Sequence, residues 1–249
     1  MSGLTQSLLF PDWPAPASVR ACVTTRQGGV SLPPYETFNL GDHVGDDPAA
    51  VAENRRRLSD TFAIQPAWLK QVHGLVVADA DPAVVAEADA SWTDQPGIAC
   101  TVMTADCLPA LFCDRAGTRV AAAHAGWRGL AGGVLEATLD RLALPPEEVL
   151  VWLGPAIGPQ AFEVGLEVRD AFTAVHPQAA RAFVEGERPG KLIADIYELA
   201  RIRLAARGVT AVYGGGLCTV SDARFFSYRR TPQGGRFASM AVSYTHLTL

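Results

Sequence analysis

Two residues that could do metal or nucleophilic chemistry lie in one stretch, TADCLPALFCDRAGTRVAAAHAGWRGLAGG, residues 104–133. Cys107 follows Asp106 in a short polar loop, and His124 ends the second of two apolar runs. The pattern of run, tight turn and run predicts a β-hairpin, in which antiparallel neighbours return to the edge where they began. We therefore expect the Cys107 thiol and the His124 imidazole to meet in space.

A further histidine could complete a metal site. His73 lies in WLKQVHGLVV, between a polar segment and an apolar run, where rigid neighbours commonly hold a functional side chain. Two neutral imidazoles and one thiolate suit Zn²⁺ and leave a fourth position for water or substrate. The spacing matches no compact zinc motif, so a cysteine hydrolase, with Cys107 as a nucleophile activated by His124, is an alternative.

An α/β (α+β) domain is the architecture that we expect to position these residues, with one central mixed β-sheet flanked by helices. Asp47 can cap the first helix, and Pro48 suits its first position. Cys100 and Cys113 fit within strands and are expected to pack. The predicted strands lie near 19–24, 75–79, 98–103, 109–113, 118–124, 149–153 and 209–214, and the predicted helices at 48–63, 130–143, 165–175 and 194–207.

Composition excludes several classes of protein. The 249 residues include 49% hydrophobic and 19% charged residues, with a net charge of -5 and no apolar run long enough to span a membrane. Arg and Lys are scattered, which argues against nucleic-acid binding. Five cysteines without a C-x-x-C pair predict reduced thiols. The first residues lack a secretory pattern, so we expect a cytoplasmic protein.

The chain is expected to form one domain over residues 1–249, because no linker or repeat interrupts it. The final residues, VSYTHLTL, do not resemble the sequence that precedes them, so residues 240–249 are a candidate for a non-native tail. We therefore do not count His246 as a candidate site residue. The glycine clusters match neither the P-loop nor the G-x-G-x-x-G pattern, so ATP and NAD are not supported as ligands.

Motifs along nearly the whole chain carry a resemblance to a known family. In order they are TRQGGVS, NLGDHVGDDP, QVHG, TADCLPALF, AAAHAGWRGLAGGVL, GPAIGPQAFEVG, and CT followed by FFSYRR and GRFAS. Together they resemble the YfiH-like (DUF152) family of bacteria. That family has been described as multicopper polyphenol oxidases, or laccases, and also as purine nucleoside phosphorylases with adenosine deaminase activity.

The resemblance implies one α/β domain whose metal site uses the His of QVHG, the Cys of TADC and the His of AHAGWRG. In this sequence these are His73, Cys107 and His124. The family metal is usually taken to be zinc, and its substrates include adenosine, inosine, guanosine and methylthioadenosine. Gln160 stands where the family usually has a cysteine, and the sequence departs from the family after Ser239.

Our first functional hypothesis is a zinc-dependent purine nucleoside enzyme. Deamination of adenosine needs a metal-activated water and a carboxylate that moves the proton, for which Asp106 is the candidate. Phosphorolysis needs cations that hold the phosphate while it attacks the ribose C1′. The candidates for binding the anion or ribose are Arg55, Arg128 and the amides near Gly126 and Gly129, followed by Arg26 and Asn39.

A copper oxidase that acts on phenols is the alternative. A laccase-type copper set needs about ten histidines, whereas this chain has five. The His₂Cys group could still bind one copper ion, since Cu²⁺ outcompetes Zn²⁺ at most such sites. Either hypothesis predicts a monomer that acts on a small molecule and binds neither nucleic acid nor membrane. Under the first hypothesis that small molecule is a purine nucleoside, with phosphate as cosubstrate.

Overall fold

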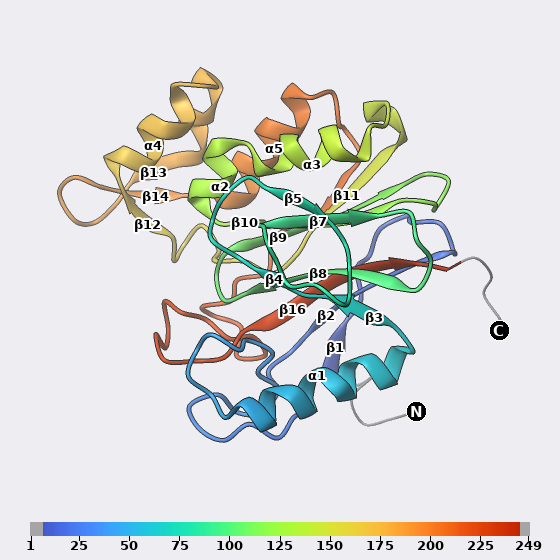
Figure 1. The fold of residues 1–249 in the computed structure, drawn as a ribbon. Helices are drawn as coiled ribbons and strands as arrows, with labels where there is room; N and C mark the ends of the chain where they lie inside the picture. The colour runs from blue at the N-terminus through green and yellow to red at the C-terminus, as the bar shows by residue number, and fades with distance from the viewer. Residues whose placement is uncertain (1–6, 245–249) are drawn as a thin grey trace.

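Two β-sheets stacked face to face form the centre of the molecule, and helices cover both outer faces (Figure 1). The computed structural model describes residues 7–244. One sheet has the order β1 (Leu8–Leu9), β2 (Val19–Thr24), β16 (Phe237–Ser243), β8 (Ile98–Thr104) and β3 (Gln65–Ala67). The other has the order β15 (Val212–Gly214), β11 (Val149–Leu153), β9 (Leu108–Asp114), β10 (Val120–Ala125), β7 (Ala90–Thr93) and β5 (Val77–Asp79).

The helices lie in two layers. The helix α1 (Pro48–Phe62) covers the outer face of the β2–β16–β8 sheet, and the remaining α-helices lie on the side of the other sheet (Figure 1). These are α2 (Trp127–Gly132), α3 (Val134–Leu142), α4 (Leu166–Thr173) and α5 (Ile196–Ala206). The smaller elements are β4 (Leu69–Lys70) paired with β6 (Ala86–Glu87), the sheet of β12 (Glu163–Gly165), β14 (Lys191–Ala194) and β13 (Phe183–Glu185), and the 3-10 helices η2 (Pro146–Glu148) and η3 (Pro177–Ala182).

Three apolar cores fill the spaces between the layers. Leu58 of α1 packs with Met103 of β8 outside one sheet, and Leu111 of β9 packs with Val102 of β8 between the sheets. Phe112 of β9 faces the core beneath α3 and α5. Because successive residues of a strand point to opposite faces, a strand buried on both sides is apolar over most of its length, as β9 and β10 are apart from Asp114 and His124.

The expected mixed α/β class is confirmed, although the strands divide into two large sheets where the sequence suggested one. The strand β8 does not join the β9–β10 hairpin that follows it. The intervening polar loop, residues 105–107, carries the chain from one sheet to the other. The sequence pattern shows that three strands follow one another, but it does not show which of them share hydrogen bonds.

The expected helix at 130–143 is interrupted. Gly133 has φ +108°, a left-handed conformation that ends α2 and precedes α3. The first of these helices begins at Trp127, earlier than predicted. The predicted helix at 48–63 forms as α1, and the Asp47 side chain accepts a hydrogen bond from the Ala49 amide at 2.9 Å.

The candidate tail contributes to the fold. Residues 240–243 belong to β16, which pairs with β2 on one side and β8 on the other. A strand was not predicted here, because the final residues of the sequence suggest a non-native end. His246 and residues 245–249 lie outside the described part of the chain. Among residues 7–244, no helix combines the length and the apolar character that crossing a membrane requires.

Candidate metal centre and substrate cavity

The β9–β10 hairpin brings Cys107 and His124 together. Pro109 pairs with His124, and Leu108 pairs with Ala125, so the loop before β9 lies beside the end of β10. His73 joins them from the loop after β4, and the candidate ligand atoms of the three residues all lie within 4.8 Å of one another. The predicted trio is therefore one spatial group.

This group fits a zinc ion. Zn–S bonds of about 2.3 Å and Zn–N bonds of about 2.0–2.1 Å place the ligand atoms of a tetrahedral ion roughly 3.3–3.6 Å apart. The Cys107 Sγ and His73 Nε2 atoms are 3.7 Å apart, and the full group spans at most 4.8 Å. Small side-chain shifts would thus complete three ligand bonds, and two imidazoles with one thiolate are donors that zinc accepts.

Asp89, just before β7, holds both histidines. Its Oδ1 atom accepts hydrogen bonds from His124 Nδ1 at 2.8 Å and from the His73 amide at 2.9 Å. Its Oδ2 atom accepts from the amides of Val72 and Gly74. The bond to Nδ1 leaves the Nε2 lone pair of His124 available for a metal. The same carboxylate fixes the loop in which His73 takes a left-handed φ of +61°.

Charges shift the pKa values of the buried pair. Burial opposes ionisation of Cys107, but the positive charges of His124 and His73 outweigh it and lower the pKa of the thiol. Burial also opposes protonation of His124, whereas Cys107 and Asp89 together raise the pKa of its imidazole. The thiol therefore reaches the thiolate form, which both metal binding and nucleophilic attack require.

Gly126 makes room for the group. A Cβ atom at this position would lie 2.7 Å from His73 Cδ2 and 3.0 Å from Cys107 Sγ, closer than packed atoms tolerate. Gly129 is placed against the backbone of the same loop, since its Cβ would lie 3.2 Å from the Gly74 carbonyl oxygen. Both glycines thus permit close packing around the candidate ligand group, and their predicted role in binding an anion or ribose stays a prediction.

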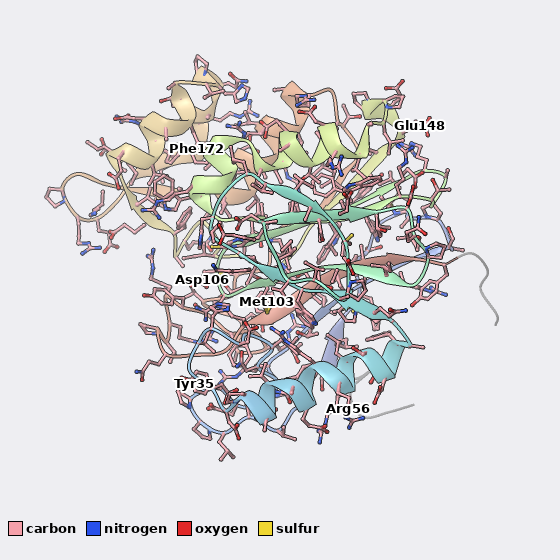
Figure 2. The ribbon with its side chains drawn as sticks, viewed as in Figure 1. Tyr35, Arg56, Met103, Asp106, Glu148 and Phe172 are labelled. Atoms are coloured by element: carbon pink, nitrogen blue, oxygen red, sulfur yellow. The ribbon has the colours of Figure 1, made fainter. Side chains whose placement is uncertain are left out.

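A cavity of about 490 Å³ adjoins the three ligands. Figure 2 shows two residues of its wall, Asp106 and Met103, between the half of the molecule that carries α2–α5 and the half that carries α1. This volume is in the usual range for a small-molecule site. Besides the three ligands, the polar lining includes His43, Gln71, Thr104, Asp106, Arg128, Tyr228, Arg229 and Arg236, and the apolar lining includes Met103, Trp127, Ile157, Phe162 and Ile196.

Of the predicted anion-binding side chains, only Arg128 lines this cavity. Its guanidinium stacks on the Trp127 ring at 4.4 Å. Arg55 donates to the Leu40 carbonyl oxygen and lies over the Trp68 ring, and Arg26 pairs with Glu36. These last two arginines therefore hold their own segments together and are not among the lining residues.

Asn39 and Asp106 also have structural partners. The buried Asn39 accepts a hydrogen bond from the Arg236 amide at 2.8 Å, so it supports the cavity wall from behind. Asp106 lines the cavity, but its two oxygens accept from Thr219 Oγ1 and the Arg229 amide, each at 2.6 Å. A carboxylate engaged in this way is poorly placed to exchange protons with a substrate.

Several residues of the site were not predicted from the sequence. Asp89 occurs in EADASW, residues 87–92, where it alternates with alanines and follows Glu87, so the sequence does not distinguish it from a surface carboxylate. Arg229 belongs to the basic run SYRR, residues 227–230, which suits a solvated face or a site for one small anion, and Arg236 belongs to GRFAS, which contributed only to the resemblance. His43 lies in the NLGDHVGDDP motif. Only the fold brings His43, Arg229 and Arg236 to one cavity and places Asp89 behind the two histidines.

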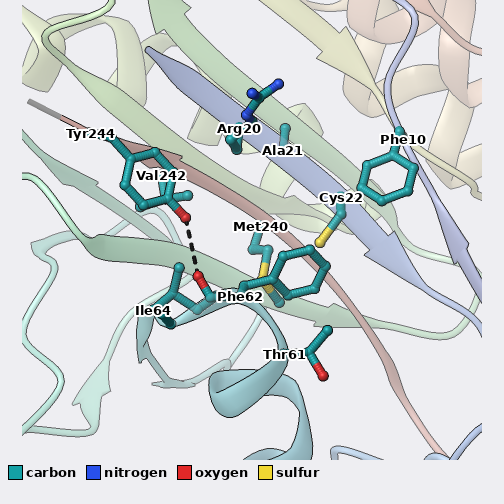
Figure 3. Close-up of a pocket in the computed structure, with 11 residues that line it drawn as sticks. Phe10, Arg20, Ala21, Cys22, Thr61, Phe62, Ile64, Met240, Val242 and Tyr244 are labelled. Carbon is teal, nitrogen blue, oxygen red and sulfur yellow. Dashed lines mark hydrogen bonds between the residues drawn. The ribbon is translucent and has the colours of Figure 1, made fainter. Parts of the chain in front are cut away.

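A larger cavity of about 610 Å³ lies on the far side of the β2–β16–β8 sheet, against α1. Figure 3 shows that its labelled lining is mostly apolar and that Tyr244 reaches the Phe62 carbonyl oxygen. Burial raises the pKa of Cys22 in its wall to about 12, so this thiol stays protonated. Without a histidine or carboxylate in its lining, this cavity does not offer comparable chemistry.

A His₂Cys group that could hold a metal ion lies at the end of a sheet, with His124 buried and His73 exposed, and it opens to a cavity with several cations. Such an arrangement is typical of a small-molecule enzyme site. Comparisons with known proteins support this class of site. The chain belongs to the YfiH-like (DUF152) family: the family model described as "Multi-copper polyphenol oxidoreductase laccase" matches residues 20–243. The match extends through β16 and leaves only later residues for the suggested non-native tail.

Relatives with names that state an activity are similar over nearly their whole length. The purine nucleoside phosphorylase of Pseudomonas aeruginosa is 69% identical over 233 residues, which cover 93% of this chain and 96% of the relative. The purine nucleoside phosphorylase YfiH of Escherichia coli is 55% identical, with coverages of 93% and 97%.

Solved structures share the fold. The Neisseria meningitidis protein NMB0706 has a TM-score of 0.93 and 53% identity, covering 96% of this chain and 99% of that one. YlmD from Geobacillus stearothermophilus has a TM-score of 0.85 and 32% identity, with coverages of 92% and 93%. These likenesses support an enzyme that acts on small molecules.

Proposed function

We propose that the protein is a zinc-dependent purine nucleoside phosphorylase. The observation that carries this proposal is the shared cavity: Arg128, Arg229 and Arg236 line it together with the three candidate metal ligands. Among residues 7–244, none of these arginines has a carboxylate oxygen within 4.0 Å. A cavity with several unpaired guanidinium groups suits an anionic cosubstrate, and inorganic phosphate is that cosubstrate in phosphorolysis.

The cavity offers a place for each part of the reaction. The apolar side chains Trp127, Ile157 and Phe162 suit a purine base, and the arginines suit phosphate. A phosphate oxygen would form a bond to C1′ as the C1′–N9 bond breaks, and the purine would leave with the electron pair and gain a proton. Holding phosphate beside the ribose lowers the entropic part of the barrier.

His73, Cys107 and His124 would hold the zinc, with Asp89 fixing the two histidines. When bound, zinc supplies a Lewis acid that polarises an oxygen atom or a water at the cavity wall. The substrates proposed are adenosine, inosine, guanosine and methylthioadenosine. We also propose a cytoplasmic monomer, and the five free cysteines support a reducing compartment.

Deamination of adenosine is less well supported by the geometry. It requires a carboxylate that moves a proton, and Asp106 is the one carboxylate that lines the cavity within residues 7–244. Both of its oxygens are engaged by Thr219 and the Arg229 amide. We therefore expect phosphorolysis to be faster than deamination in the same preparation.

Copper oxidation of phenols has one specific observation in its favour. His43 also lines the cavity, which brings a third histidine near the His₂Cys group. The chain's five histidines still fall short of a laccase-type set. Oxidase activity is therefore expected only after copper loading, through a single ion.

One experiment tests the proposed reaction. Protein purified without added metal is analysed for metal content and then assayed with each nucleoside, with and without phosphate, before and after chelation. We expect free purine base and ribose 1-phosphate, dependent on phosphate and lost with the metal. Base release without phosphate, or turnover unchanged after complete metal removal, would overturn the proposal and in the second case favour a cysteine hydrolase.

A matched pair of variants distinguishes the loss of a metal ligand from a general loss of structure. Cys107→Ala should abolish both metal binding and turnover, because it removes one of three ligands. Cys218→Ala removes the other partly exposed thiol, which lies outside the cavity lining, and should leave both unchanged. Equal loss in the two variants would contradict the assignment of Cys107 as a ligand.

A further inference from the structure

The guanidinium of Arg236 is held at the cavity wall from several directions. The Arg236 amide donates to Asn39 Oδ1, and the side chain passes so close over Gly41 that a Cβ there would lie 2.9 Å from its Cγ atom. Its Nη1 group donates to the carbonyl oxygens of Gly234 and Gly235, each at 3.0 Å. The side chain is therefore immobilised before any ligand binds, which reduces the entropic cost of binding.

The rest of this guanidinium has no partner in the described residues. Within residues 7–244, Nε and Nη2 of Arg236 make no hydrogen bond and no ion pair. Burial lowers the pKa of Arg236, and the nearby Cys107 and Asp106 partly offset this effect. A partly buried cation with free donors is costly unless an anion joins it.

The other two cavity arginines are less suited to hold an anion firmly. Arg128 is exposed and stacks on Trp127 without a hydrogen bond among the described residues. Arg229 is exposed, and its two Nη groups donate to the carbonyl oxygens of Ala161 and Glu163. Only Arg236 combines partial burial with free donors on a fixed side chain.

A second polar group in the lining of this cavity lacks a partner within residues 7–244. Thr104 ends β8, pairs with Phe237 of β16 and lines the same cavity. The residue is 1% exposed, and its Oγ1 atom has no hydrogen-bond partner within residues 7–244. Because β16 places Arg236 directly before Phe237, the unpaired hydroxyl and the guanidinium belong to adjacent strand ends.

We propose that Arg236 and Thr104 form the phosphate subsite of this cavity, with Nε and Nη2 of Arg236 and the Thr104 hydroxyl as donors to phosphate oxygens. This inference rests on the proposed phosphorylase function. It assigns the cosubstrate to the ends of β8 and β16, while the candidate metal ligands come from the loops around β9 and β10. Asn39 acts as a positioning residue, through the Arg236 backbone.

Direct phosphate binding to the full-length protein tests the subsite without relying on turnover. Inorganic phosphate is titrated by calorimetry, and the KM for phosphate is measured separately with inosine. Arg236→Gln should weaken phosphate binding at least about tenfold, since two charge-assisted donors are lost. Arg20→Gln removes the same charge from the wall of the other cavity and should leave phosphate binding unchanged.

Thr104→Val gives a readout that a merely structural role would not produce. Removing an unpaired buried hydroxyl should leave the melting temperature equal or higher, while phosphate binding weakens about three- to tenfold. Ser239→Ala removes another buried hydroxyl without a partner, outside the cavity lining, and should not change phosphate binding.

The outcomes distinguish the subsite from the function. If wild type binds phosphate and both Arg236→Gln and Thr104→Val bind it as tightly, with an unchanged KM for phosphate, the subsite is overturned and the phosphorylase function stands. If wild type releases base without any need for phosphate, the function itself fails. If Arg236→Gln does not fold, Arg236→Lys and Thr104→Val still decide the question, since the subsite predicts weaker phosphate binding in both.

Discussion

Asp89 is the residue on which the geometry of the ligand group depends most. Its carboxylate is fully buried and accepts hydrogen bonds from the His124 ring and from three successive amides, 72–74. Burial opposes its ionisation, but the hydrogen bonds from His124 and Gly74 keep the pKa of Asp89 below its ordinary value. One side chain thus orients one ligand and fixes the loop that presents another.

Asp89→Asn should lower the free energy of unfolding of the metal-free protein by about 3 kcal/mol at pH 7, because an amide NH₂ would face amide donors. A depressed folded pKa contributes stability that is present above the unfolded value of about 3.9 and lost as pH falls through the folded pKa. The contribution of the carboxylate to the difference between wild type and variant should therefore be lost as pH falls below about pH 4. Urea unfolding at each pH measures it, and a difference independent of pH would contradict the role given to this carboxylate.

The five thiols differ in ways that chemical labelling can resolve. Burial raises the pKa values of Cys22, Cys100 and Cys113 to about 12. Burial also opposes ionisation of Cys218, but hydrogen bonds from Ser221 and nearby amides lower its pKa. Cys107 has a lowered pKa through the histidines. Thiolates are the reactive form, so two classes of cysteine are expected.

Iodoacetamide at pH 7 should therefore modify Cys107 and Cys218 in metal-free folded protein and leave the other three thiols intact until unfolding. Excess zinc should protect Cys107 and leave Cys218 reactive, which provides a control within the same chain. Mass spectrometry of digested protein identifies the modified residues. Equal modification of Cys107 with and without zinc would argue against its role as a ligand.

At the scale of elements, the break between α2 and α3 depends on one glycine. Gly133 has φ +108°, and a Cβ there would make only ordinary contacts, the nearest with Arg203 at 3.4 Å. Gly133→Ala should therefore cost about 1–2 kcal/mol of unfolding free energy through backbone strain alone. Gly133→Asn should cost less, because asparagine tolerates the left-handed region better. Thermal and urea unfolding of the two variants test this order, and an Asn variant less stable than the Ala variant would refute the explanation.

The same elements show what could be predicted from the sequence. Some elements have a clear pattern of apolar residues or a clear cap, such as β2, β11 and α1. Their predicted ends lie within a residue or two of the ends in the structure. The trio of candidate ligands, His73, Cys107 and His124, could be predicted because Cys and His are the residue types that metals such as zinc prefer. Asp89 and Arg236 were not predicted, because their roles arise from contacts with residues far away in the sequence, His124 and Asn39. Sequence periodicity reports which face of an element is apolar, but it carries little information on which elements become neighbours.

At the scale of the whole molecule, the last described strand joins the beginning and the middle of the chain. The strand β16 pairs with β2 through residues 239–243 and with β8 through residues 237–242. Its residues alternate between two cores: Ala241 faces the space between the sheets, and Met240 and Val242 face α1. The ends of β8 and β16 also carry Thr104 and Arg236, so the integrity of this strand and of the cavity are linked.

Truncation separates the role of β16 from that of the residues after it. A chain ending at Ser239 loses four of the seven residues of β16 and exposes the edges of β2 and β8. Because three of the four lost side chains are buried and apolar, we expect no cooperative unfolding transition from this chain. A chain ending at Tyr244 keeps every pairing of β16 and should unfold cooperatively at the melting temperature of the full chain. Calorimetry and circular dichroism of both chains measure the difference, and a cooperative transition at an unchanged temperature in the shorter chain would show that residues 240–243 are dispensable for the fold.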